Sequence, residues 1–94
     1  MYGIIVQVVV DANREDEARK ILHDMVVPQA RTRPGFTAGY WLRSLDDNVL
    51  RAVQIYDSDD TARAAAEHIR SAGAPPGAPV TLQSVDIYEV LARA

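Results

Sequence analysis

Histidine, tyrosine and glutamine side chains are the residues of this chain that could carry out proton chemistry. His68 is the first candidate for a catalytic base, because the helical pattern around it places it beside an apolar stripe, whereas His23 faces solvent. Tyr56 ends an expected strand, and its phenol could orient a substrate oxygen. The structural alternatives are a boundary histidine and a tyrosine that caps the sheet. Two histidines without a third ligand make a poor metal site, so we predict no metal.

Polar and aromatic side chains in the expected strands are the candidate ligand-binding residues. Gln7 lies among valines and isoleucines, and a buried amide without partners costs about 1–3 kcal/mol. It is explained either by a polar pocket or by a satisfied amide in the sheet or an interface. Tyr40 and Trp41 are adjacent, so they point to opposite faces of a strand, where each could contact a flat ligand or fill a core. The ligand-binding candidates are Gln7, Tyr40, Trp41 and Gln54.

Composition excludes several classes of function. The 94 residues form one expected domain, residues 1–94, with 48% hydrophobic and 24% charged residues, which argues against disorder. A net charge of −3 without clustered Lys and Arg argues against nucleic-acid binding. The absence of cysteine excludes disulfides, thiolate nucleophiles and Cys-bound metals. The run Ile4–Val10 has no basic leader and is too short to cross a bilayer, so we expect a cytoplasmic protein without membrane contact.

The first half of the chain predicts a strand followed by an amphipathic helix. Gly3–Val10 is rich in β-branched side chains on both parities, as expected of a strand covered on both faces. Asn13 is the expected cap of a helix over Arg14–Ala30, with Pro28 disturbing its last turn. The side chains expected to face the sheet are Ala18, Ile21, Leu22, Met25 and Gln29.

The middle of the chain predicts a β-hairpin, with strands over Phe36–Ser44 and Val49–Tyr56 joined by turn residues 46–48. The register of this hairpin depends on the length of its loop. Relative to a loop of two or four residues, a loop of three moves every side chain of one strand to the opposite face of the sheet. With two or four residues, one face carries Phe36, Ala38, Tyr40, Leu42, Val49, Arg51, Val53 and Ile55.

A second helix and a last strand complete the pattern. Ser58 is the expected helix cap, and Gly73 the expected C-terminal cap. An alanine-rich stripe faces inward, and Arg63 and Glu67 form an expected pair one turn apart on the outside. A stiff proline-rich connection over residues 74–79 then leads into a strand over Val80–Leu91.

This β-α-β-β-α-β order predicts an α+β, ferredoxin-like fold, with a four-stranded antiparallel sheet and both helices on one face. The other face has no cover within the chain. We expect that face to carry Ile5, Val9, Trp41, Leu50 and Tyr56. So much contiguous apolar surface is unusual on a monomer, so we expect two copies to form a homodimer through their sheets.

Two short segments resemble a known superfamily. The residues Arg33-Pro34-Gly35-Phe36 before a strand and Tyr56-Asp57-Ser58-Asp59-Asp60 before a helix are similar to those of the dimeric α/β-barrel superfamily, in its antibiotic-biosynthesis monooxygenase-like branch. The resemblance implies a homodimer whose sheets close into a barrel, with a ligand pocket between the sheet and the helices of each subunit. It also implies oxygenases that act on polycyclic phenols or quinols without a cofactor, or haem-degrading enzymes.

The haem-degrading branch uses an Asn on the first strand, a Trp in the second helix and a His after that Trp. Here Gln7 stands near the Asn position, Ala64–Ala66 contains no Trp, and His68 comes too early. The resemblance therefore implies no cofactor, with haem possible but not favoured, and oxidation of a small aromatic phenol or quinol by O₂. In that hypothesis His68 or Tyr56 assists proton removal, Gln7 stabilises the oxyanion and Trp41 stacks on the substrate.

Two other functions stay open at this point. One is a homodimeric module that binds a small ligand without catalysis, and the other is a structural or regulatory protein with no pocket. An enclosed cavity lined by polar groups that converge on one point would favour catalysis. An interior filled by side chains would favour the structural protein.

Overall fold

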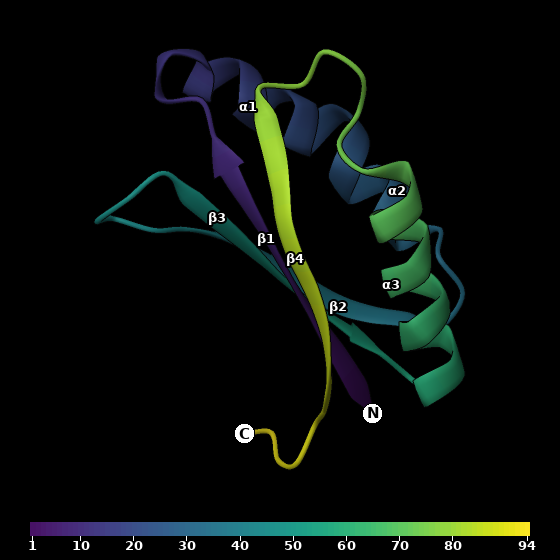
Figure 1. Ribbon diagram of the computed structural model, residues 1–94. Coiled ribbons are helices and arrows are strands. Elements are labelled where there is room, and N and C mark those ends of the chain that lie inside the picture. Colours follow the sequence, from purple (N-terminus) through teal and green to yellow (C-terminus); the bar gives the residue numbers. More distant parts are fainter.

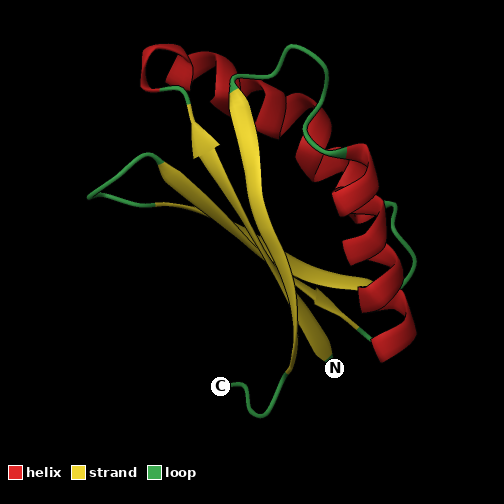
Figure 2. Cartoon of the chain, in the orientation of Figure 1, coloured by secondary structure: helices red, strands yellow, loops and turns green.

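All 94 residues are described by the computed structural model, which has the expected element order. Its elements are β1 (Tyr2–Val10), η1 (Ala12–Arg14), α1 (Glu15–Ile21), η2 (Leu22–Val26), α2 (Val27–Arg31), β2 (Phe36–Arg43), β3 (Val49–Tyr56), α3 (Asp59–Ala72) and β4 (Val80–Glu89). One antiparallel sheet has the strand order β2-β3-β1-β4. All helices lie on one face of this sheet (Figures 1 and 2). The ferredoxin-like α+β prediction is confirmed.

The expected first helix is interrupted by a wide turn. Residues Leu22–Val26 form the π-helical turn η2, in which the Val27 N–H donates to the Leu22 carbonyl, five residues back. Pro28 explains the turn, because it has no N–H to donate to the carbonyl four residues earlier and its ring would collide with that carbonyl. The predicted cap at Asn13 is wrong. The Asp11 carboxylate caps this end instead, accepting from the Asn13 N–H at 3.0 Å.

The hairpin loop has four residues, Leu45–Asn48, closed by a hydrogen bond of 3.1 Å from the Ser44 N–H to the Val49 carbonyl. The Asp47 carboxylate accepts from the Val49 N–H at 2.9 Å, and this bond holds the pKa of Asp47 below its ordinary value. The register for a four-residue loop is confirmed along most of the hairpin. A bulge between Phe36 and Ala38 exchanges the face of Phe36, which therefore joins the helix-facing core instead of the open face.

Helix α3 begins and ends where its sequence predicts. Ser58 caps it in a reciprocal pair with Thr61, and Gly73 ends it with φ of +64°. Its buried stripe of small side chains, which lets it lie close to the sheet, consists of Ala62, Ala65 and Ala66. The predicted Arg63–Glu67 pair is wrong: Arg63 pairs with Asp59 at 2.6 Å. Helical side chains lean toward the N-terminus, which brings Arg63 to the first turn.

The two sheet faces divide differently from the prediction. Ile5 and Val9 lie on the face away from the helices, as expected, but Trp41, Leu50 and Tyr56 lie on the helix side. The reason is the pairing of β3 with β1, in which Val6 lies opposite Ala52. The β3 side chains on the same face as Ala52 therefore point toward the helices, as Val6 does. The open face therefore carries Ile5, Val9, Tyr40, Leu42, Val49, Val53 and Ile55.

Gly35, in the turn between α2 and β2, is a position where a side chain does not fit. Its φ is +76°, and an added Cβ would overlap Asp57 Oδ1 and lie 2.6 Å from Thr61 Oγ1. We expect Gly35→Ala to lower the free energy of unfolding by about 2–4 kcal/mol, through left-handed backbone strain and this overlap. Urea denaturation measures the loss.

Gly77 provides the matched control for this substitution. Its φ is +77°, but an added Cβ there meets nothing within 4 Å. Gly77→Ala should therefore cost only the backbone strain, about 1–2 kcal/mol. Equal losses for the two substitutions would contradict the steric role of Gly35.

Candidate functional site

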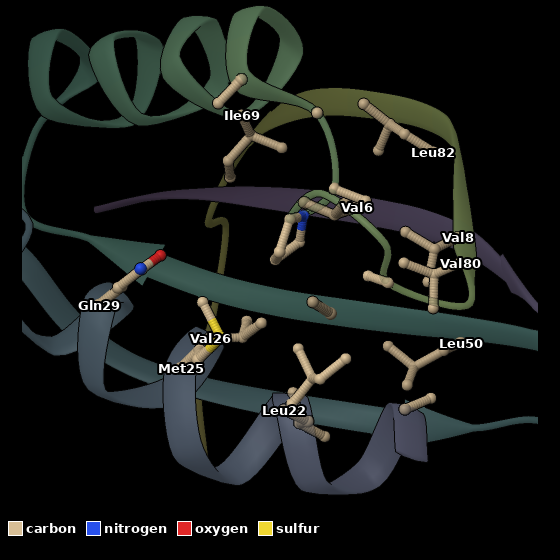
Figure 3. A pocket seen from close by; sticks show the side chains of 18 of the residues that line it. Val6, Val8, Leu22, Met25, Val26, Gln29, Leu50, Ile69, Val80 and Leu82 are labelled. Carbon is tan, nitrogen blue, oxygen red and sulfur yellow. The ribbon is translucent and has the colours of Figure 1, made fainter. Parts of the chain in front are cut away.

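A cavity of about 330 Å³ lies between the sheet and the helices. Figure 3 shows the sheet residues Val6, Val8 and Leu50 on one side and the helical residues Leu22 and Met25 on the other. Volumes of roughly 300–1,000 Å³ are typical of small-ligand sites, and so is a mostly apolar lining. The apolar lining also includes Ala18, Ile21, Val26, Trp41, Ala52, Ile69, Ala72, Val80 and Leu82.

The cavity exists because the two helical segments pack against the sheet in different ways. Helix α3 packs closely on β1, β3 and β4 through its alanines, whereas α1 has no comparable packing against any strand. Longer side chains such as Leu22 and Met25 hold the first helical segment away from the sheet. The predicted inward stripe of that segment therefore lines the cavity instead of filling it. The proline-rich connection after α3 adds Gly73–Pro76, Ala78 and Pro79 to the wall.

The deepest polar group of the cavity is the Gln54 side chain, which is only 2% exposed. Its Oε1 accepts from the Tyr56 hydroxyl at 2.8 Å and from Arg33 Nη1 at 3.1 Å. Gln54 comes from the inner strand β3, and Arg33 comes from the turn after α2. The turn at Pro34 and Gly35 therefore brings a guanidinium onto a buried amide 21 residues further along the chain.

Two more polar side chains line the cavity near its opening. His68 on α3 and Gln29 on α2 both line the cavity and are both exposed to solvent. Figure 3 shows the Gln29 amide beside Met25, on the helical side of the cavity. The site thus has a polar opening between α2 and α3, an apolar middle and a polar floor at Gln54.

The structure brings three of the predicted site residues together: Trp41, Gln54 and His68 all line this cavity. Tyr56 is fully buried behind Gln54 and does not line it, so its hydroxyl reaches the cavity only through the amide. The residues missed by sequence reasoning include Arg33, whose only signal was its place in the turn that carried the family resemblance.

Two predicted residues lie elsewhere. Gln7 is on the open face of the sheet, where its Nε2 donates to Ser84 Oγ at 3.2 Å. The hypothesis that Gln7 stabilises an oxyanion in this cavity is therefore not supported, because β1 turns its odd-numbered side chains away from the helices. Tyr40 is 66% exposed and lines an adjoining groove instead of the cavity.

The adjoining groove, of about 460 Å³, lies between α1 and the β2–β3 hairpin. An ion pair crosses it, from Arg43 on β2 to Glu15 on α1 at 2.5 Å. Its lining is more charged than that of the cavity and includes Asp47. The groove and the cavity share the wall residues Ala18, Leu22, Trp41 and Leu50.

Comparison with known proteins gives structural matches only. No protein-family model matches the chain, and no curated protein matches it. MhuD, a haem-degrading protein from Mycobacterium tuberculosis solved with two haems in its active site, matches with a TM-score of 0.79 and 22% identity, over 100% of this chain and 99% of its own. A protein from Nitrosomonas europaea assigned to the antibiotic biosynthesis monooxygenases matches with a TM-score of 0.68 and 21% identity, over 98% and 100%.

The Streptomyces coelicolor monooxygenase ActVA-Orf6, solved with nanaomycin D, matches with a TM-score of 0.63 and 15% identity, over 99% of this chain and 89% of its own. This chain has the fold of the antibiotic biosynthesis monooxygenase-like proteins. The resemblance read from the two short segments is confirmed at the level of the fold.

The porphyrin-bound structures of the same fold correct one prediction. We predicted no cofactor, with haem not favoured, because the Asn–Trp–His triad is absent. MhuD and a variant of it with two manganese protoporphyrins per active site match over the whole chain, so a firm expectation of no cofactor is wrong. Absence of the triad was therefore not sufficient to exclude a cofactor.

Two further observations concern metal binding and membrane crossing. No group of three His, Asp or Glu side chains is placed to hold a metal ion. None of the helices is both long and apolar enough to cross a lipid bilayer.

Proposed function

We propose that this protein binds a small aromatic phenol or quinol in the cavity between its sheet and α1–α2, and oxidises it as a monooxygenase. The observation that carries the proposal is the cavity itself, an apolar space with a buried amide at its floor and an imidazole at its opening. The matches to monooxygenases of the same fold, ActVA-Orf6 among them, support this class of reaction.

Each lining residue has a definite task in this proposal. Trp41 offers an aromatic surface to a flat ring, while the aliphatic wall excludes water from the reacting carbon atoms. His68 accepts the proton of a phenolic hydroxyl that lies at the opening, which leaves the electron pair on the phenolate oxygen. Loss of that proton makes the ring electron-rich and so activates it toward O₂. One oxygen atom stays on the ring as a quinone carbonyl, and the other leaves as water with two hydrogen atoms of the substrate, which itself supplies the electrons.

Haem is the second candidate ligand, and the match to MhuD over the whole chain favours it. Haem iron needs an axial donor, and His68 is the one imidazole in the cavity lining. Arg33, the one guanidinium in the lining, suits a propionate carboxylate. These residues fit the group: His68 would hold the iron and Arg33 a propionate. Bound haem would supply an iron centre that activates dioxygen.

Ligand titration tests both candidates. Trp41 is the only tryptophan of the chain and lines the cavity, so its fluorescence reports occupancy. We expect 1-naphthol or haemin to quench it, with a dissociation constant on the order of 1–10 µM. Ala72→Phe, at the cavity lining near the end of α3, should weaken that binding about tenfold or more by blocking entry.

Ala64→Phe is the matched control, because Ala64 is exposed on the same helix and does not line the cavity. Failure of 1-naphthol to bind would overturn the phenol proposal, and failure of haemin to bind would overturn the haem candidate. An oxygen electrode then separates catalysis from binding: bound naphthol should raise O₂ uptake above the protein-free rate. Tight binding without uptake would favour the non-catalytic ligand-binding module.

We further propose that two copies form a homodimer through the open sheet face. One subunit exposes 6100 Å², whereas a monomeric protein of 10.3 kDa exposes about 5,400 Å². The excess, about 700 Å², is close to the roughly 800 Å² that each partner buries in a standard interface. The apolar side chains of the open face supply a surface of the chemistry that such an interface needs.

A further inference from the structure

We propose that the floor of the cavity selects ligands that present an acceptor oxygen at the end opposite the phenolic hydroxyl, such as a quinone carbonyl or a carboxylate. The selecting group is the amide nitrogen of Gln54, and Arg33 is a positioning residue that sets the direction of this amide. The inference rests on the proposed role of the cavity as an aromatic-ligand site, and it names the chemistry of the ligand oxygen.

Two hydrogen bonds decide the orientation of the Gln54 amide. A guanidinium has donors only, so the atom that Arg33 Nη1 contacts at 3.1 Å must be the carbonyl oxygen of the amide. The Tyr56 hydroxyl donates to the same oxygen at 2.8 Å. Both lone pairs of Oε1 are therefore occupied. Rotation of the amide by 180° would place Nε2 beside the guanidinium, so that two donors would face each other. The two N–H groups of Nε2 are the hydrogen-bonding capacity that Gln54 has left.

These two donors face the cavity. Gln54 lines the cavity, and its Nε2 donates to no group of the protein. Yet no buried side-chain nitrogen or oxygen lacks a hydrogen-bond partner. Nε2 is therefore not fully enclosed, and the 2% of Gln54 that stays accessible includes this atom. A ligand oxygen that reaches the floor meets a donor whose direction is already set.

The charges around the floor favour the same kind of ligand. The chain has 13 Asp and Glu residues, but none of them lines the cavity. Arg33 is the only lysine or arginine in the lining. The adjoining groove differs, because Glu15 and Asp47 line it. An anion on an aromatic ring is therefore attracted to the cavity, and an ammonium group on the same ring is repelled.

A pair of probes that share the naphthyl ring and carry opposite charges tests the wild-type protein. 2-Naphthoate and 2-naphthylmethylammonium are titrated by calorimetry and by Trp41 fluorescence, with neutral naphthalene as reference. We expect naphthoate to bind about tenfold to hundredfold more tightly than the ammonium probe, as a hydrogen bond to a charged acceptor implies. Equal binding of the two charged probes would overturn the inference.

Gln54→Glu replaces the hydrogen-bond donor at the cavity floor by an acceptor. The new carboxylate can still accept from Arg33 and Tyr56, but it presents an acceptor oxygen to the cavity in place of an N–H. We expect the preference to invert, with the ammonium probe binding more tightly than naphthoate. Gln7→Glu is the matched control, because it makes the same chemical change on the opposite face of the same sheet. It should leave the preference unchanged.

Arg33 is tested by the same ratio of affinities. Arg33→Met removes a donor from Oε1 and frees the amide to turn, so the ratio should fall about tenfold. Arg33→Lys keeps a donor and the charge, and should restore most of it. If Arg33→Met and Arg33→Lys give the same ratio of naphthoate to ammonium affinity, the positioning role of Arg33 is overturned.

The possible failures are distinguishable. If no naphthyl compound binds, the proposed function and this inference both fall. If naphthalene and both charged probes bind equally, the aromatic-ligand site stands and only the selection by Gln54 is overturned. Should Gln54→Glu not fold, the wild-type probe pair still decides the case.

Discussion

Replacement of Tyr56 by alanine is expected to lower the free energy of unfolding by about 3–5 kcal/mol, as for other large aromatic residues removed from cores. A domain of this size has only about 5–15 kcal/mol in total, so this substitution removes a large share of it. Tyr56 is one of the two largest fully buried side chains, and its ring packs nearly perpendicular to that of Phe36 with 5.8 Å between centroids. No neighbouring element can move in to fill the space, because α3 already rests on the sheet through alanines.

The hydroxyl and the ring of Tyr56 make separable contributions. Tyr56→Phe keeps the packing against Phe36 and removes only the bond to Gln54 Oε1, which should cost about 1 kcal/mol. Chemical denaturation of both variants, followed by far-UV circular dichroism, measures the two losses. A loss of under 1 kcal/mol for Tyr56→Ala would show that this residue is not at the centre of the core.

Val53→Asp is expected to weaken the proposed homodimer at least a hundredfold. Val53 lies in the middle of the open sheet face, between Ile5 on β1 and Tyr40 on β2. A carboxylate there would be buried without a partner in a sheet-to-sheet interface, and two-fold symmetry would introduce it twice. Within one subunit the position is only half-buried, so the fold itself should tolerate the change.

Analytical ultracentrifugation measures this effect directly. At micromolar concentration the wild type should sediment as a particle of about twice 10.3 kDa, and the Val53→Asp variant as a monomer of 10.3 kDa. Ala64→Asp, on the exposed side of α3, adds the same charge away from the open face and should leave the dimer intact. A wild type that sediments as a monomer at this concentration would overturn the homodimer proposal.

Local signals were enough to predict most elements of the fold. Hydrophobic periodicity placed all four strands and both helical segments, and Ser58 and Gly73 marked the ends of α3 correctly. These signals work because a cap or a turn depends on a few consecutive residues. The error at Asn13 has the same local character, since Asp11 offers another side-chain oxygen that can cap the helix two residues earlier.

The candidate site was predictable only in part. Trp41, Gln54 and His68 were predicted as candidate site residues from their chemistry, and all three line the cavity. Gln7 was a candidate because its amide lies among apolar residues, and its oxyanion role came from the family resemblance, whereas its place on β1 turns it to the opposite face. Arg33 was seen only as part of a turn, because its contact with Gln54 spans 21 residues and no local pattern encodes it.

The linear order of residues was sufficient for the element order, the antiparallel α+β class and the presence of an uncovered apolar sheet face. Those properties follow from periodicities of two and 3.6 residues and from capping chemistry, which neighbouring residues encode. Long-range packing assigned Trp41, Leu50 and Tyr56 to the helix side and placed Gln54 in the lining of a cavity. Pairing of β3 with β1 and the distance of α1 from the sheet set both features, and each depends on contacts between residues far apart in the chain.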